Sequence, residues 1–193
     1  MRFLFSLLMT VFCFASSAQV ENQKASCLKV SFGLNLGFSF FHEKLPENVT
    51  YKPVLILGYY NRPLSKGQKN YAFSWYLEPQ INPVIIGNKL SELEFGVNTG
   101  IAFSYQLAPN YQVYAAIGTG PHFVTVKTAS QARGFIFSDN FIIGMKRSFL
   151  MNDKSYDLNL QYRFRHISNA NLMLPNKGID NHFVILGLNR CIN

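Results

Sequence analysis

The sequence lacks the features that mark several common protein classes. After its first residues it has no apolar run long enough for a membrane-spanning helix, no internal repeat, and no linker that would divide it into domains. Its cations outnumber its acids by 18 to 10, but they form no basic run interleaved with aromatic residues, so nucleic-acid binding is not indicated. His42, His122 and His182 show no metal-ligand spacing with cysteines or acids. The sequence therefore predicts neither a metal site nor a cofactor.

Residues 1–18 have the pattern of a secretory signal peptide. Arg2 gives a positive start, residues 3–14 are almost continuously apolar, and Ser16 and Ala18 are small residues that suit cleavage after Ala18. A cytosolic core helix is the alternative interpretation of this run. We expect residues 19–193 to form one exported domain. Its net charge near +7, the full-length +8 without Arg2, suits anionic lipid better than nucleic acid.

Only three cysteines are present, and Cys13 lies in the predicted signal peptide. Cys27 and Cys191 lie near the two ends of the remaining chain. In an oxidising compartment they could form a disulfide if the fold brings its ends together. Two separate free thiols are the alternative, and the sequence leaves both open.

What the chain has in abundance is period-two alternation. In residues 28–40, 71–80 and 93–105, large apolar side chains alternate with residues that are mostly small or polar. Alternation of this kind predicts β-strands, and no segment fits helical spacing as well. Long aromatic side chains on one face and Gly, Ser, Asn and Gln on the other indicate lipid outside and a tight polar interior. A soluble lipocalin-like barrel or sandwich is the alternative.

Eight such runs predict an all-β, eight-stranded antiparallel transmembrane β-barrel. The expected strands are 28–41, 53–62, 71–82, 93–106, 111–121, 135–147, 156–168 and 180–190. The connections 63–70, 107–110 and 148–155 are short, whereas 42–52, 83–92, 122–134 and 169–179 are mostly longer. Strand parity places several charged residues in the interior, where we expect them to form ion pairs. They are Lys29, Glu78, Glu94, Lys146, Asp157, Arg163 and Arg165.

The end of the seventh run carries the most specific pattern. His166 and Ser168 share the parity of the lipid-facing residues, whereas Arg163 and Arg165 point inward. Asp180 shares the lipid-facing parity of the eighth run, so an antiparallel hairpin would bring it beside His166. A hydroxyl, an imidazole and a carboxylate in this order have the logic of a serine hydrolase. The alternative is that these are ordinary rim residues just above the bilayer.

Residues 162–187 resemble the signature of the outer-membrane lipid A 3-O-deacylases, the PagL-type family. The similarity consists of an Arg-rich lead into His-x-Ser-Asn-Ala, followed by Pro-Asn-x-Gly-Ile and an acid. It implies that Ser168 is the nucleophile, His166 the general base and Asp180 the orienting acid. It also implies that Asn169, Ala170 and Asn176 supply oxyanion donors or shape the turn.

The chain departs from that family's pattern in two places: Asp180 stands where the family often has Glu, and Asn171 stands where it commonly has Gly. The chain also lacks the terminal aromatic residue that is typical of bacterial outer-membrane barrels. The shorter acid requires a closer approach to the imidazole, and Asn171 puts the backbone geometry at that position in question.

The resemblance implies a lipid A ester hydrolase of the bacterial outer membrane, acting on lipopolysaccharide. Arg133, Lys127 and Lys177 would contact the lipid A phosphates, or they are simply solvated loop charges. The competing hypotheses are a non-catalytic barrel for lipid binding or envelope structure, and an esterase for phospholipids. Homodimerisation stays open.

Overall fold

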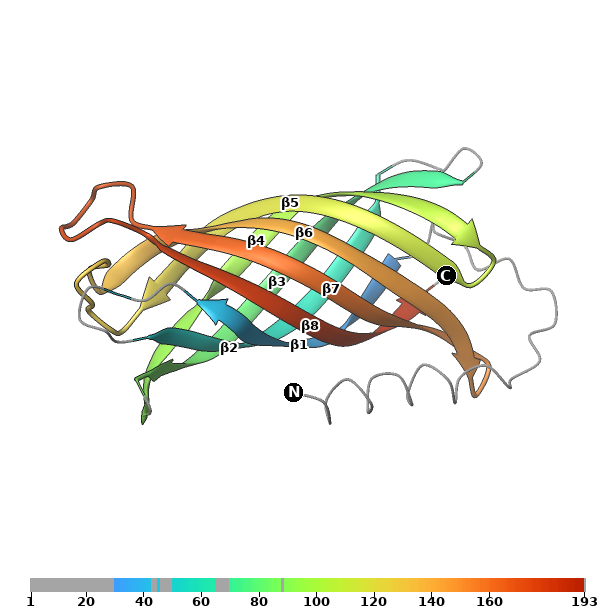
Figure 1. The fold of residues 1–193 in the computed structure, drawn as a ribbon. Helices are drawn as coiled ribbons and strands as arrows, with labels where there is room; N and C mark the ends of the chain where they lie inside the picture. The colour runs from blue at the N-terminus through green and yellow to red at the C-terminus, as the bar shows by residue number, and fades with distance from the viewer. Residues whose placement is uncertain (1–29, 43–44, 46–49, 65–69, 88, 193) are drawn as a thin grey trace.

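The structure is a computed structural model, and it describes residues 30–42, 45, 50–64, 70–87 and 89–192. Eight strands form a closed antiparallel barrel in which each strand pairs with its sequence neighbours and β1 pairs with β8 (Figure 1). The strands are β1 (Val30–His42), β2 (Tyr51–Pro63), β3 (Tyr71–Ile86), β4 (Lys89–Ala108), β5 (Tyr111–Val124), β6 (Gly134–Met151), β7 (Lys154–Ser168) and β8 (Ile179–Ile192). The predicted fold is confirmed.

The two ends of the barrel differ. At one end, called the turn end, β4 and β5 are joined by residues 109–110, and β6 and β7 by residues 152–153. At the other, called the loop end, residues 125–133 connect β5 to β6 and residues 169–178 connect β7 to β8 (Figure 1). The C-terminal end of β8 lies at the turn end. The predicted signal peptide and Cys27 lie outside the described residues.

The prediction of a long connection over residues 83–92 is wrong. β3 continues to Ile86 and β4 begins at Lys89, so only residues 87–88 join them. Gly87 has a φ of +60°, a left-handed conformation that suits a tight turn. The error arose because Pro83 and the apolar residues on both faces near it hide the alternation.

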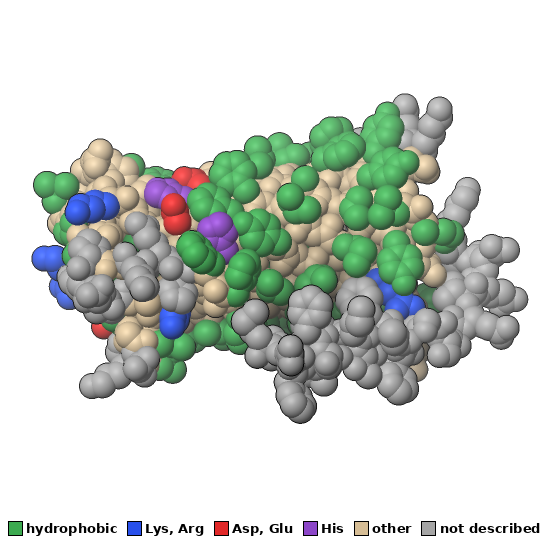
Figure 2. All heavy atoms as spheres, viewed as in Figure 1, with side chains coloured by type: hydrophobic (Ala, Val, Ile, Leu, Met, Phe, Trp, Pro, Cys, Tyr) green, Lys and Arg blue, Asp and Glu red, His purple; other side chains and the backbone are tan. Residues whose placement is uncertain are grey.

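The outer wall is covered with apolar side chains (Figure 2). Phe38, Phe103, Phe141 and Leu186 are among the large hydrophobic residues that stay exposed around the barrel. Exposed apolar and buried polar residues alternate along the strands, as in the pair Phe141 and Asn140. Such a surface needs lipid around it. No helix among the described residues is long and apolar enough to cross a membrane.

Ion pairs fill the middle of the interior. Arg163 donates two hydrogen bonds of 2.8 Å to Glu78, and Arg165 binds Glu94 with distances of 2.7 and 3.0 Å. Both guanidinium groups are fully buried. The inward direction predicted for these four residues is therefore confirmed. Lys146 is also buried inside, whereas Lys29 lies outside the described residues.

The interior is not polar throughout, which departs from the prediction. A cluster of buried apolar side chains closes the tube near the loop end. Its residues are Leu45, Tyr51, Val84, Val124, Val126, Ile136, Ile167 and Ile179. Side chains here still alternate between inward and outward directions, but both sets are apolar. The inward ones can be apolar because the interior at this level contains side chains rather than water.

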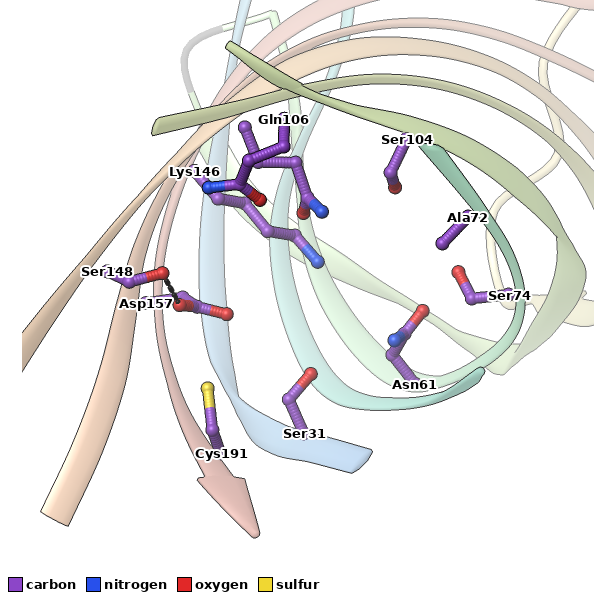
Figure 3. A pocket seen from close by; sticks show the side chains of 11 residues that line it. Ser31, Asn61, Ala72, Ser74, Ser104, Gln106, Lys146, Ser148, Asp157 and Cys191 are labelled. Atoms are coloured by element: carbon purple, nitrogen blue, oxygen red, sulfur yellow. Dashed lines mark hydrogen bonds between the residues drawn. The ribbon is translucent and has the colours of Figure 1, made fainter. Parts of the chain in front are cut away.

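The interior near the turn end is hollowed and polar (Figure 3). Lys146 extends into this hollow, and Ser148 donates a 2.7 Å hydrogen bond to Asp157 beside it. Cys191 also lines it and is a free thiol in the structure. The disulfide to Cys27 stays a prediction because Cys27 is outside the described residues.

Candidate active site

The β7–β8 hairpin brings His166 and Asp180 together on the outer wall. The two residues are direct partners in the antiparallel register. His166 Nδ1 lies 2.6 Å from Asp180 Oδ1, which is hydrogen-bond distance. The side chains are 37% and 47% exposed, whereas Arg165 and Asn181, their neighbours along the strands, are fully buried inside. The sequence-based direction of both side chains is therefore confirmed.

Ser168 follows His166 on the same face of β7, at the last residue of the strand. Among the described residues none hydrogen-bonds to its Oγ, which leaves the hydroxyl free to turn. The Nε2 edge of the His166 ring faces Gly178, at the end of the loop that Ser168 begins. Nδ1 is thus held by the carboxylate, while the Cε1–Nε2 edge lies beside Gly178 and makes no hydrogen bond to Ser168 Oγ.

Gly178 leaves room for the His166 ring. Its φ is +76°, and a Cβ added there would overlap His166 Cε1 and lie only 2.9 Å from Nε2. A side chain at this position would therefore have to displace the imidazole. The presence of glycine at position 178 is therefore explained by its close contact with the His166 ring.

The β7–β8 loop is organised by asparagine side chains. Asn176 Oδ1 accepts a 2.8 Å hydrogen bond from the backbone N–H of Asn169, and Asn176 Nδ2 donates to Asn171 Oδ1 at 3.0 Å. Ala170 and Asn171 both have positive φ, at 53° and 63°. Asparagine tolerates this left-handed conformation better than most residues. Asn171 therefore adopts the backbone conformation for which glycine is the usual choice, and its side chain orients Asn176.

Three basic residues lie on two loops of the loop end that are hydrogen-bonded to each other. The backbone N–H of Lys177 donates to Ser130 O at 2.7 Å, and that of Ala132 donates to Pro175 O at 2.8 Å. These bonds tie the β5–β6 loop to the β7–β8 loop. The side chains of Lys177 and Arg133 are exposed, one on each loop, and Lys127 is exposed on the first.

The sequence analysis missed two polar groups on the wall beside the dyad. Asp139 of β6 is the register partner of His166 on the side away from Asp180, and Thr119 donates a 2.6 Å hydrogen bond to it. His182 of β8 contacts Tyr162 Oη at 2.7 Å and packs among several aromatic rings. Among the described residues, no group of three or more His, Cys, Asp or Glu could hold a metal ion.

A signal for Asp139 was present in the sequence. Asn152 and Asp153 both have positive φ and form the two-residue turn between β6 and β7, in which Met151 pairs with Lys154. A two-residue hairpin fixes every later pair, including Asp139 with His166. Recognising the Asn-Asp dipeptide as the turn would have placed this carboxylate.

The fold and site define a membrane-embedded β-barrel whose polar side chains gather on the lipid-facing wall near one rim. A family model described as lipid A 3-O-deacylase (PagL) matches residues 54–189. The chain therefore belongs to the PagL family of lipid A deacylases, which are hydrolases, and it is a barrel of the bacterial outer membrane. Because short turns of such barrels usually face the periplasm and longer loops the outside, we expect the loop end to face outward.

A solved structure with the same fold is described as the crystal structure of the outer membrane enzyme PagL. It is 14% identical to this chain, with a TM-score of 0.52, and the match covers 82% of this chain and 97% of the other. Among curated proteins, none matches the chain.

Replacing Gly178 with alanine is expected to lower ester hydrolysis by about a hundredfold, the effect typical of a misplacement of about 1 Å at a reacting centre. The added methyl group must push the His166 ring away from its present position. Initial rates with a chromogenic ester, measured on purified protein in detergent micelles, check the expectation.

Gly87→Ala is the matched control. Gly87 has a similar φ of +60°, but a Cβ there would meet nothing within 4 Å. Both variants therefore share the backbone strain, and only one displaces the imidazole. Equal losses of activity in the two variants would show that strain alone, not the His166 contact, explains the effect.

Proposed function

We propose that this protein hydrolyses the 3-O-linked acyl ester of lipid A, with Ser168, His166 and Asp180 as its catalytic residues. The observation that supports this most strongly is the 2.6 Å His166–Asp180 contact on the lipid-facing wall, with Ser168 on the same face. An ester in the outer leaflet can reach such a site by lateral diffusion, without being extracted into water.

In the proposed reaction, His166 Nε2 takes the proton of Ser168 as Oγ bonds to the ester carbonyl carbon. Asp180 holds Nδ1–H and stabilises the imidazolium that forms. The imidazolium then returns the proton to the departing sugar hydroxyl. Water, activated by the neutral His166, cleaves the acyl-enzyme and releases the fatty acid. The exposed side chains of His166 and Asp180 lie near the rim, where this water can enter.

The tetrahedral oxyanion needs hydrogen-bond donors, and the β7–β8 loop can supply them. Asn176 Nδ2 has two hydrogens, of which one is bonded to Asn171 Oδ1 and one is left for substrate. The backbone N–H of Ala170 lies at the same turn. The N–H of Asn169 is bonded to Asn176 Oδ1, which gives Asn169 a turn-shaping role. One good donor is typically worth about 3–4 kcal/mol of transition-state stabilisation.

The basic residues above the site suit the phosphate groups of lipid A. Arg133 and Lys177 are exposed on two loops joined by backbone hydrogen bonds, so the two loops lie side by side at the same end of the barrel. Charge-assisted hydrogen bonds from these side chains would position the head group while the acyl chains lie along the barrel.

Mass spectrometry of lipid A from cells that express the protein tests this proposal. We expect the loss of one hydroxyacyl chain from the 3-position, and no fatty acid released from phospholipids. Unchanged lipid A in the presence of correctly folded protein would contradict the proposal and favour a non-catalytic barrel. Fatty acid released from phospholipids instead would identify a different esterase.

A further inference from the structure

The β7–β8 loop carries three consecutive large apolar side chains that stay exposed. Leu172, Met173 and Leu174 are 69%, 57% and 80% exposed, and their loop stands out at the loop end of the barrel (Figure 1). Loops are usually polar, and a run of three exposed apolar residues is unfavourable in water unless it serves function. We call these three residues the apolar tip. The proposed reaction gives them no role.

Hydrogen bonds hold the apolar tip close to the proposed nucleophile. The backbone N–H of Leu172 donates to Asn169 O at 3.0 Å, and Asn169 Nδ2 donates to Met173 O at 2.6 Å. Asn169 is itself buried, and it directly follows Ser168 in the chain. The apolar tip is therefore a fixed part of the loop that begins at the site, presented with its side chains exposed.

The lipid-facing wall extends to the height at which this loop begins. Phe95, Phe123 and Phe135 are successive register partners on β4, β5 and β6, and all three are exposed. On β6, Phe137 is the register partner of Ser168, and Phe135 lies two residues further toward the loop end. The three phenylalanines thus form a row just beyond the height of Ser168, as the aromatic girdle at a membrane interface does. The loop that carries the apolar tip begins at this interface.

Basic side chains flank the apolar tip. Lys177 is exposed three residues after Leu174. Arg133 and Lys127 are exposed on the β5–β6 loop, which is hydrogen-bonded to the β7–β8 loop. Apolar residues beside cations are typical of segments that lie in the interface of an anionic membrane. A second copy of this chain fits the apolar tip less well, because a symmetric contact would bring the same cations together.

We propose that the apolar tip, residues 172–174, inserts among the acyl chains of the outer leaflet and anchors the β7–β8 loop in the membrane. This anchoring does not require the protein to be an enzyme. Its consequence for catalysis rests on the proposed function. The loop also holds Asn176, whose Nδ2 is bonded to Asn171 Oδ1, so the anchor would keep the candidate oxyanion donor at the depth of the scissile ester.

Tryptophan fluorescence of the full-length protein in phospholipid vesicles tests the insertion directly. Leu174→Trp in a Trp75→Phe background places the single indole of the chain in the apolar tip. We expect its emission to shift to shorter wavelength and to be quenched by phospholipids brominated on their acyl chains. Phe141→Trp in the same background is the positive control, because Phe141 is exposed in the middle of β6. Pro109→Trp, in an exposed turn, is the control outside the acyl layer.

Three results are distinguishable. Quenching of the Leu174→Trp variant as strong as that of Phe141→Trp would support insertion. Emission at shorter wavelength without quenching would overturn it, because protein, such as a second copy of this chain, would then cover the apolar tip. Emission and quenching equal to those of Pro109→Trp would also overturn it, because the indole would then lie in water.

Replacing all three residues of the apolar tip with serine tests the consequence for catalysis. We expect kcat/KM for lipid A in vesicles to fall by about tenfold or more, as when one large apolar side chain is withdrawn from an apolar environment. The rate with soluble p-nitrophenyl acetate should stay unchanged. Leu107→Ser is the control, because Leu107 is a similarly exposed apolar residue at the turn end. It should change neither rate.

The two experiments separate the anchor from the proposed function. Equal losses on lipid A and on the soluble ester would overturn the link between insertion and catalysis, because the serines would then disturb the site itself. A folded wild type that is inactive on both substrates, with Leu174→Trp quenched by the brominated lipids, would overturn the proposed function and support the anchor.

Discussion

Ser168→Ala is expected to abolish lipid A deacylation, with a loss in kcat of about 10⁶-fold, as for the nucleophile of other serine hydrolases. The substitution removes the hydroxyl that shares the outward face with His166 at the last residue of β7. It leaves the His166–Asp180 contact and the loop hydrogen bonds of Asn169 and Asn176 in place. The measurement is the lipid A mass spectrum from cells that express equal amounts of each variant.

Two further variants make this result specific. Ser155 lies on the same strand at the turn end, and Ser155→Ala should leave the lipid A mass spectrum unchanged. The double variant Ser168→Ala with His166→Ala should be no less active than Ser168→Ala alone, because residues that act as one unit are strongly non-additive. Additive losses would indicate that the two side chains act independently, and residual deacylation in Ser168→Ala would remove the serine from its assigned role.

Arg165→Met is expected to destabilise the barrel by about 3–5 kcal/mol, the effect of breaking a buried ion pair by removing one partner. The variant leaves the buried carboxylate of Glu94 without its guanidinium partner. Its remaining hydrogen-bond partners are Tyr51, Asn82 and His122. Arg165 precedes His166 on β7, and loosening of this strand should lower activity as well. Urea unfolding in detergent micelles, followed by the fluorescence of the single tryptophan, Trp75, measures the change.

Lys154→Met is the control for the loss of a positive charge from β7, because Lys154 is exposed at the turn end. It should change the free energy of unfolding by less than about 0.5 kcal/mol. Adding Glu94→Gln to Arg165→Met removes the unpaired charge and should restore part of the stability. A single variant as stable as wild type would mean that the ion pair contributes nothing net to the fold.

The direction of the catalytic candidates could be predicted because it depends only on strand parity. The catalytic candidates His166, Ser168 and Asp180 follow the same alternation as the exposed apolar residues of β7 and β8. The antiparallel pairing of these two strands then places Asp180 beside His166. The position of Asp139 beside His166 could not be deduced in this way, because it depends on the register between β6 and β7. That register is set by a two-residue turn whose Asn-Asp dipeptide was not recognised.

Other features depend on packing that one sequence does not show. The extension of β3 and β4 at the loop end could not be predicted, because Pro83 and apolar residues on both faces obscure the alternation there. The apolar cluster inside the loop end joins residues from six strands, such as Tyr51 and Ile167, with Leu45 and Val126 from loops. Parity predicts that most of these side chains point inward, but not that they meet and close the interior.

That closed interior has a consequence for traffic across the envelope. The apolar cluster at the loop end and the arginine pairs beneath it fill the described part of the interior with buried side chains. We therefore expect cells that carry many copies of this barrel to stay impermeable to ions and nutrients. Each turnover would also release both of its products into the outer monolayer. Two smaller amphiphiles would then replace one large lipid, and the lipid packing around the protein would become looser.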